Sequence, residues 1–170
     1  SNPLRLVFIG RSRASSGLDL LLNAINKCLK QNLHLHLQCF GCFLDSNPHV
    51  VSYGSCSALD IQKLSAGAQI GIYPGDSGLS ILHYMSLGLC PVTHDSLRLH
   101  CGPEPAYLID GMNGFTFKRY SLESLVSLLQ FLYHNPKLVY NSRLQARNTA
   151  VQIHSVSYSE ELSSIMNVTP

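Results

Sequence analysis

The chain has 170 residues, of which 45% are hydrophobic and 13% charged, and its formal net charge is +2. This length predicts one domain that buries enough surface to fold without disulfides or a metal. The low share of charged residues excludes a disordered chain and a coiled coil. The near-neutral charge gives no electrostatic footprint for nucleic acid, so we expect no nucleic-acid partner.

The sequence contains no apolar run of the roughly 20 residues that a membrane span needs, and no basic segment precedes the short apolar run 4–10. We therefore expect neither a signal peptide nor a transmembrane helix. The chain begins with Ser1 rather than Met, which we interpret as the start of a domain excised from a longer protein. We expect one Rossmann-like domain over residues 1–170, with a helical segment at 137–170.

The cysteines lie mostly in apolar segments, where a free thiol behaves as a small hydrophobe, and this favours a reducing, cytoplasmic compartment. They are Cys28, Cys39, Cys42, Cys56, Cys90 and Cys101. Cys39 and Cys42 form a CxxC motif, but it lies at a strand end without a second pair, so it is a poor zinc or redox site. His34 and His36 share one strand face, but no spacing completes a metal site, and we expect no bound metal.

Short apolar runs alternate with longer amphipathic ones along the chain. In order they predict a strand at 4–9, a helix at 18–30, strands at 33–40 and 50–53, a helix at 58–66, a strand at 70–73, a helix at 79–87, strands at 91–93 and 114–118, and helices at 122–134, 137–155 and 159–166. Helical crossovers between most strands indicate the α/β class, an open Rossmann-like parallel sheet with helices on both faces.

In such sheets, ligands bind where the carboxyl end of a strand leads into a helix. The first such loop, residues 10–17, places Arg11 and Arg13 between Gly10 and Gly17. Glycine permits close backbone approach, and arginine offers paired donors for phosphate oxygens. A single glycine-rich loop is a weak signal, and a solvated basic turn is the alternative.

The second such loop holds Gly75, Ser77 and Gly78 directly before a predicted helix. We expect the first amides of this helix to be free and to face the carboxyl edge of the sheet, where they attract anions. These amides belong to Gly78, Leu79 and Ser80.

His83 follows one turn into the same helix and is expected to reach the same edge. A buried core histidine is the alternative. We expect Leu79, Leu82 and Met85, which share helical spacing, to pack toward the sheet. A third polar strand end, residues 93–95, is followed by the segment 100–104.

Several segments together resemble the C-terminal, nucleotide-sugar-binding domain of GT-B-fold glycosyltransferases, the retaining group called family 4 or group 1. They are residues 6–22, 57–74, 73–92 and 102–117. Their order and spacing are specific, and the resemblance covers nearly the whole chain. It implies transfer of a hexosyl group from a nucleotide-diphosphate sugar to a glycan or lipid-linked acceptor, in polysaccharide or lipopolysaccharide biosynthesis.

The sequence departs from this family at charged positions. The family's central motif usually has two glutamates, which fall at Gly75 and His83. The usual loop lysine falls at Ser16, and the glutamate of the family's Pro-Glu pair falls at Ala106, although Glu104 lies nearby. One interpretation is a non-catalytic scaffold or partner-binding module. The other, which we favour because the loop glycines are kept, is a variant branch that still binds donor.

The resemblance implies a donor site with no metal and no tightly bound cofactor. Arg11 and His83 are the predicted catalytic residues: Arg11 would neutralise the diphosphate and His83 would orient the ribose. The other predicted donor-binding residues are Gly10, Arg13, Gly54, Ser55, Gly75, Ser77, Gly78, Leu79, Ser80 and Glu104. The acceptor would be held by an N-terminal domain of the same protein. That domain could also bind the inner face of the membrane peripherally.

Overall fold

The structure is a computed structural model that describes residues 2–45 and 47–166, with side chains described to residue 155. Its strands are β1 (Leu4–Ile9), β2 (Leu35–Phe40), β3 (Val50–Ser52), β4 (Ile70–Ile72), β5 (Cys90–His94) and β6 (Phe115–Phe117). Its helices are α1 (Leu18–Lys30), α2 (Ala58–Leu64), α3 (Ser80–Ser86), α4 (Leu122–His134) and α5 (Pro136–Met166). Short 3-10 helices cover Ala14–Ser16, Leu97–Leu99 and Glu104–Tyr107.

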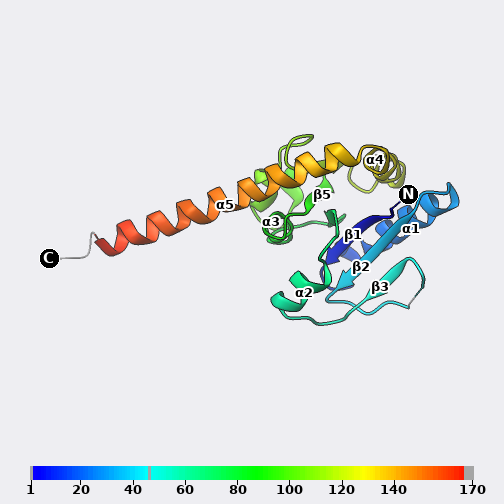
Figure 1. The fold of residues 1–170 in the computed structure, drawn as a ribbon, viewed down its shortest axis with the longest axis horizontal. Coiled ribbons are helices and arrows are strands. Elements are labelled where there is room, and N and C mark those ends of the chain that lie inside the picture. The colour runs from blue at the N-terminus through cyan, green and yellow to red at the C-terminus, as the bar shows by residue number, and fades with distance from the viewer. Residues whose placement is uncertain (1, 46, 167–170) are drawn as a thin grey trace.

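The strands form one sheet in the order β3-β2-β1-β4-β5-β6, and each neighbouring pair is parallel. The first strand therefore lies in the centre, and the chain builds outward from it in one direction and then in the other (Figure 1). This confirms the predicted fold class, a Rossmann-like α/β domain.

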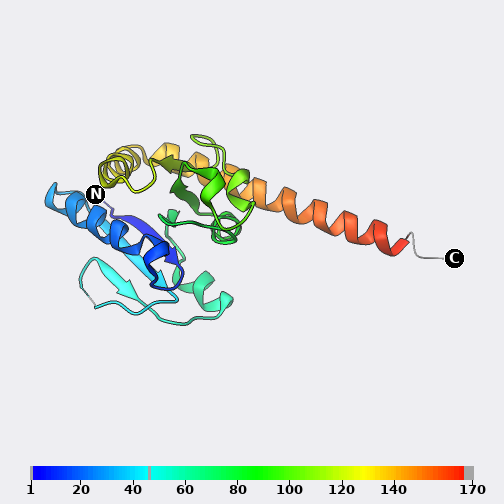
Figure 2. The same cartoon turned by 180° about the vertical axis from the view of Figure 1, so that it is seen from behind.

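Two apolar clusters pack on opposite faces of the sheet, and alternate residues of β1 belong to each. Leu6 and Phe8 join the cluster that contains the buried side of α1 and α4. Val7 joins the cluster that contains Ile61 of α2, the buried side of α3 and Ala146 of α5. Figure 2 shows α1 in front of β1 and β2, whereas in Figure 1 these strands lie in front of it. Burial on both faces explains why the strands read as apolar runs.

Tyr84 of α3 ties the two central strands together. Its buried hydroxyl accepts a hydrogen bond from the Ile9 amide (3.0 Å) and donates one to the Ile72 carbonyl (3.1 Å). The ring lies directly over Gly71, where a Cβ would come within 2.1 Å of the Tyr84 Cγ. Only glycine fits at this position of β4, so the strand and the helix depend on each other.

The C-terminal part of the chain corrects one expectation. A break was predicted between helices at 137–155 and 159–166, but α5 runs without interruption from Pro136 to Met166 and extends past the sheet (Figure 1). After Pro136 this segment contains no glycine or proline that would end a helix. Residues 167–170 of the predicted helical segment lie outside the described residues. In the part of the chain that is described, no helix has the length and apolar character to cross a membrane.

Candidate functional site

The direction in which strands are added to the sheet reverses between β1 and β4, and in open α/β sheets ligands bind outside the carboxyl ends of the strands at such a topological switch point. The loops that follow these two strands are in direct contact. The Gly75 amide donates to the Ser16 carbonyl (3.0 Å), and the Asp76 amide donates to the Ser15 carbonyl (3.3 Å). The two glycine-containing loops predicted from the sequence are therefore brought together at the switch point.

Gly75, which aligns with the first family glutamate, has no space for a side chain. A Cβ there would lie 1.9 Å from the Ser15 carbonyl oxygen. Gly17, with φ of +71°, approaches from the other loop, and a Cβ on it would lie 2.7 Å from the Gly75 amide nitrogen. The glutamate that the family usually carries here therefore has no room in this packing of the two loops.

The start of α3 carries amides without acceptors. Among the described residues, no hydrogen bond from the amides of Gly78, Leu79 or Ser80 is formed. The Leu79 side chain is 73% exposed, which corrects the expectation that it packs toward the sheet. The buried side of α3 consists instead of Ile81, Tyr84 and Met85.

Asp76 is clamped between two elements that lie far from it in the sequence. Its carboxylate accepts two hydrogen bonds from Nη2 of Arg119 (2.7 and 2.9 Å) and lies 3.0 Å from Nε2 of His94. Burial alone would raise the pKa of the Asp76 carboxyl, but the hydrogen bonds from Arg119 and His94 outweigh it and hold that pKa below its usual range. Asp76 is therefore ionised at neutral pH and fixes the loop before α3.

The rings of His94 and His100 are stacked, with 3.8 Å between centroids and 10° between planes. His100 accepts the Ser77 amide hydrogen at Nδ1 (3.0 Å), while its Nε2 lies 3.1 Å from the His94 carbonyl oxygen. Because burial disfavours the imidazolium, the pKa of each histidine lies below its usual value. Both rings are therefore neutral at neutral pH.

Glu104, one of the residues predicted from the sequence to bind the donor, lies beside this loop. Its Oε2 is buried and has no hydrogen-bond partner among the described residues. The carboxylate folds over Gly102, where a Cβ would lie 2.2 Å from Oε2, and the nearest atom to a Cβ on Gly78 would be the same oxygen at 3.8 Å. An unpartnered acceptor thus faces the turn that carries the free amides.

The predicted residues of the first loop lie at the same edge. Arg11 and Arg13 are exposed, and no hydrogen bond from either guanidinium is made within the described residues. Gly10 packs against Tyr73, whose ring atom Cε2 would be 2.9 Å from a Cβ there. This close packing explains why residue 10 is a glycine. Both arginines, exposed and without hydrogen bonds to the described residues, are available to a ligand.

Gly54 follows β3 with φ of +63°, and Ser55 beside it is exposed. The ring of Phe43 lies over Gly54, since a Cβ at that glycine would be 2.3 Å from the Phe43 Cζ. Phe43 is 84% exposed, which is unusual for a phenylalanine. Phe43 was not among the residues predicted from the sequence, although its place after β2, at the carboxyl edge of the sheet, was a usable signal.

His83 lies apart from the other predicted residues. It is half-buried in a groove of about 320 Å³ between α2, α3 and α5, with Gln62 and Arg143 among the lining residues. Neither Arg11 nor Gly78 is among the described residues that line this groove. Burial lowers the pKa of His83 below its usual value. The structure thus gathers the two loops and Glu104 but does not bring His83 and Arg11 into one pocket.

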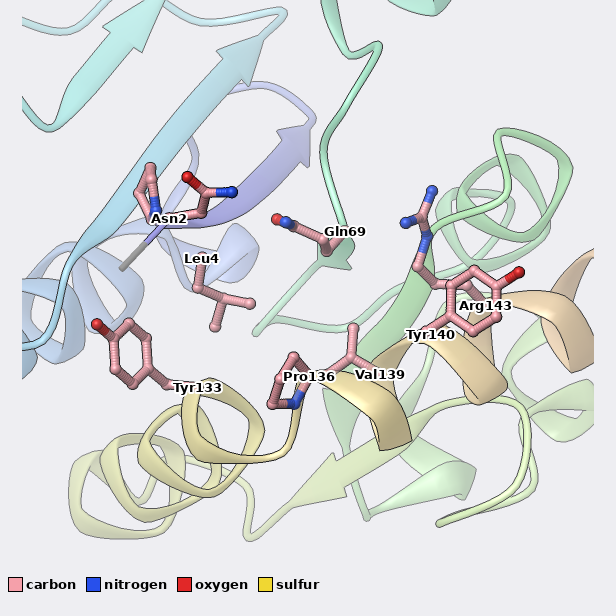
Figure 3. A pocket seen from close by; sticks show the side chains of 9 residues that line it. Asn2, Leu4, Gln69, Tyr133, Pro136, Val139, Tyr140 and Arg143 are labelled. Atoms are coloured by element: carbon pink, nitrogen blue, oxygen red, sulfur yellow. The ribbon is translucent and has the colours of Figure 1, made fainter.

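Another hollow, of about 310 Å³, lies near the amino end of β1 and is lined by Leu4, Gln69, Tyr140 and Arg143 among others (Figure 3). It contains none of the predicted site residues. Cys39 and Cys42 are both buried, and burial raises the pKa of each thiol, which argues against a redox CxxC. Within the described ranges there is no group of three or more potential metal ligands.

Comparison with known proteins gives the class of the chain. The profile of the family described as "Glycosyl transferases group 1" matches residues 3–135. The chain therefore belongs to the group 1 glycosyltransferases, which confirms the resemblance that the sequence motifs suggested. No curated protein matches the chain.

Solved structures share the fold at low sequence identity. Anabaena HepE in complex with UDP and glucose is 16% identical with a TM-score of 0.76, over 99% of this chain and 49% of that one. The pneumococcal O-GlcNAc transferase GtfA in complex with UDP and GlcNAc is 14% identical with a TM-score of 0.75, over 96% of this chain and 36% of that one. The C-terminal domain of the group 1 family protein LpcC from Francisella tularensis is 16% identical with a TM-score of 0.72, over 87% and 84%. The chain thus spans half or less of HepE and GtfA, but most of the LpcC domain.

Proposed function

We propose that this chain is the donor-binding domain of a glycosyltransferase that takes a hexosyl group from a nucleotide-diphosphate sugar. The observation that carries the proposal is the contact between the 10–17 and 73–79 loops at the switch point, next to the amides of Gly78, Leu79 and Ser80, which have no acceptor among the described residues. In a group 1 glycosyltransferase, amides at this edge suit a diphosphate. UDP is the nucleotide present in HepE and GtfA, so we take UDP-sugars as the first donors to test.

The free arginines of the first loop suit the diphosphate charge. Arg11 and Arg13 are exposed just before α1, their guanidinium groups make no hydrogen bond or ion pair with the described residues, and they can form paired hydrogen bonds to phosphate oxygens. Glu104 offers an unpartnered carboxylate oxygen, which a sugar hydroxyl can satisfy as donor. We assign the diphosphate to Arg11, Arg13 and the α3 amides, and a sugar hydroxyl to Glu104.

The nucleoside is assigned to the side of the switch point where β2 and β3 end. Gly54 and Ser55 lie there, and the exposed Phe43 ring over Gly54 offers an apolar surface on which a base can stack. His83, the residue expected from the sequence to orient the ribose, lies in the separate groove between α2, α3 and α5, so we leave it out of the assigned donor site. The acceptor, a glycan or a lipid-linked molecule, is assigned to an N-terminal domain of the same protein, working at the cytoplasmic side of a membrane.

Isothermal titration of the chain with UDP and UDP-glucose tests this proposal. We expect saturable binding, and thermal stabilisation of about 2.7 kcal/mol at a ligand concentration a hundred times the dissociation constant. Arg11→Ala should weaken UDP binding by about tenfold, the scale of a hydrogen bond to a charged group. Lys30→Ala removes the same charge from the other end of α1 and should leave binding unchanged.

A second candidate function is a non-catalytic scaffold. It is favoured by one observation: neither position of the family's glutamate pair carries a carboxylate, and Gly75 has no space for one. No binding of any nucleotide or nucleotide sugar, by a chain that unfolds cooperatively, would reject donor binding and leave the scaffold. Equal losses for Arg11→Ala and Lys30→Ala would reject the assigned site.

A further inference from the structure

We propose that His100, supported by His94, is a positioning residue that holds residues 76–79 in their donor-binding shape, and that protonation of His100 releases them. This inference rests on the proposed function, because it concerns the same loop. It adds a pH dependence that originates in residues outside the assigned donor contacts.

Residue Ser77 is held on every polar side. Its amide donates to Nδ1 of His100 (3.0 Å), and its carbonyl accepts the Cys101 amide (2.8 Å). Its hydroxyl lies 3.0 Å from the same Nδ1 and 3.2 Å from Oγ1 of Thr93, which in turn donates to the Tyr73 carbonyl. Ser77 is 1% exposed, so water does not replace these partners. The turn that presents the next amides is therefore fixed from the 100–101 segment.

The contacts of His100 define where its single proton resides. Nδ1 accepts the Ser77 amide hydrogen, so it carries no proton. Nε2 lies 3.1 Å from the His94 carbonyl oxygen, which can only accept, so Nε2 carries the proton. A second proton would place an N–H of the ring against the N–H of Ser77. The imidazolium therefore loses the hydrogen bond from the Ser77 amide and keeps at Nδ1 only the Ser77 hydroxyl oxygen as an acceptor.

His94 adopts the same tautomer and supports the ring of His100 by stacking. Its Nδ1 accepts the Ser96 amide hydrogen (3.2 Å), so its Nε2 donates to Asp76. Residues 76 and 77 are consequently held by two stacked rings, one contacting the Asp76 carboxylate and the other the Ser77 amide. Because the two rings are stacked, we expect a shift of one to displace the other.

The charged and titratable groups around the pair come from every neighbouring element. They are Tyr73 and Asp76 from the loop after β4, Asp95 after β5, Cys101 and Glu104 from the following segment, and Arg119 before α4. Burial opposes an imidazolium at His100 most strongly, and the Arg119 guanidinium opposes it too, whereas the hydrogen bond to the His94 carbonyl and the Asp76 carboxylate favour it; the pKa of His100 falls below its usual value. Loss of the neutral ring is therefore expected on the acid side of pH 6.5.

The test measures UDP-glucose affinity against pH, with His100→Asn as the informative variant. An asparagine Oδ1 can accept the Ser77 amide hydrogen in place of Nδ1 but does not titrate. The wild type should lose about tenfold in affinity between about pH 7 and pH 5, the scale of one buried hydrogen bond lost. His100→Asn should keep its neutral-pH affinity and show a flat profile. His34→Asn, an exposed histidine before β2, is the matched control and should follow the wild type.

A second readout follows the loop without any ligand. The protection factor of the Ser77 amide, measured by hydrogen exchange, should decrease in the wild type as the pH is lowered. In His100→Asn it should stay constant. Identical profiles in the two proteins, for affinity and for protection, would overturn the proposal. If no nucleotide binds at any pH, the proposed function fails, and Ser77 protection alone then decides whether His100 holds the loop.

Discussion

Gly75 and Ser15 are in backbone contact: the Gly75 Cα lies where any Cβ would be 1.9 Å from the Ser15 carbonyl oxygen. The contact joins the loop after β4 to the loop after β1, and two backbone hydrogen bonds accompany it. A side chain at position 75 would therefore separate the two loops that form the candidate site. The absence of a glutamate at this position is a requirement of the packing and does not by itself indicate loss of function.

Gly75→Ala should destabilise the domain by about 3 kcal/mol, at the upper end of overpacking effects, because backbone atoms must move. Gly78→Ala is the matched control, since the nearest atoms to a Cβ there lie at 3.8 Å. Its effect on stability should stay within about 0.5 kcal/mol. Urea unfolding followed by circular dichroism measures both. Equal stabilities of the two variants would contradict the contact.

Tyr84→Phe removes a buried hydroxyl that serves one donor and one acceptor of the central strands. The Ile9 amide and the Ile72 carbonyl would lose this partner, which should reduce the free energy of unfolding by about 1–3 kcal/mol. Tyr140→Phe, on an exposed tyrosine of α5, should have almost no effect. Chemical denaturation of the pair tests this, and an unchanged unfolding midpoint for Tyr84→Phe would reject the bridging role.

The stability of the domain should decrease as the pH falls below 6.5. The pKa values of His94 and His100 lie below their ordinary value of 6.5, because burial disfavours the charged rings. The unfolded chain then binds more protons than the folded one, so the stabilisation is complete above pH 6.5 and is lost as the pH falls through the lowered values. The pKa of Asp76 lies below 3.8, so its own contribution disappears only at still lower pH.

Urea midpoints measured across this pH range give the experimental test. His100→Asn should reduce the loss of stability between about pH 7 and pH 5, since one of the titrating rings is gone. A midpoint that rises on acidification in that range would contradict the assignment of neutral, buried rings.

Thiol-reactive reagents should modify Cys101 before the other cysteines. Cys101 is exposed, whereas burial raises the pKa of Cys28 to about 11 and that of Cys90 to about 12. Thiolate is the reactive form, so the buried thiols should react only on unfolding. Peptide mapping by mass spectrometry after brief labelling identifies the site, with Cys101→Ser as the control. Because the Cys101 thiol contacts the Asp76 carbonyl, the adduct should also weaken UDP-glucose binding.

The spacing of apolar residues was sufficient to predict the bounds of some helices and strands, but not the buried face of every helix. The bounds of β1, α1 and α4 agree with the predicted ranges, because their apolar spacing matches the faces that they bury. The buried side of α3 was predicted only in part: Met85 is buried and Leu82 packs partly against the core, but Leu79 is exposed. Tyr84, which no apolar pattern distinguishes, is drawn inward by the space above Gly71, and Leu79 is left at the surface. That choice depends on a contact between two elements and is not encoded in the spacing of one helix.

In the candidate site, too, some features could be predicted from the sequence and others could not. The glycine-containing loops at the strand ends could be predicted, because a parallel sheet brings its carboxyl ends to one edge. The clamp on Asp76 could not, since Arg119 lies 43 residues further along the chain and belongs to no recognisable motif. The stacked pair His94 and His100 was likewise visible only as two polar residues near a strand end.

The central position of β1 has a consequence for synthesis of the chain. β1 pairs with β2 early, but its other edge pairs with β4 through Leu6 and Val7, and contacts across this join link residues 64 positions apart. Until β4 has left the ribosome, a partly made chain presents the open edge of an apolar strand, which is a template for association with other chains. The nascent protein is therefore most exposed to aggregation before Ile70–Ile72 emerges, and the join between the two halves is the slow step of its folding because the intervening loop must close first.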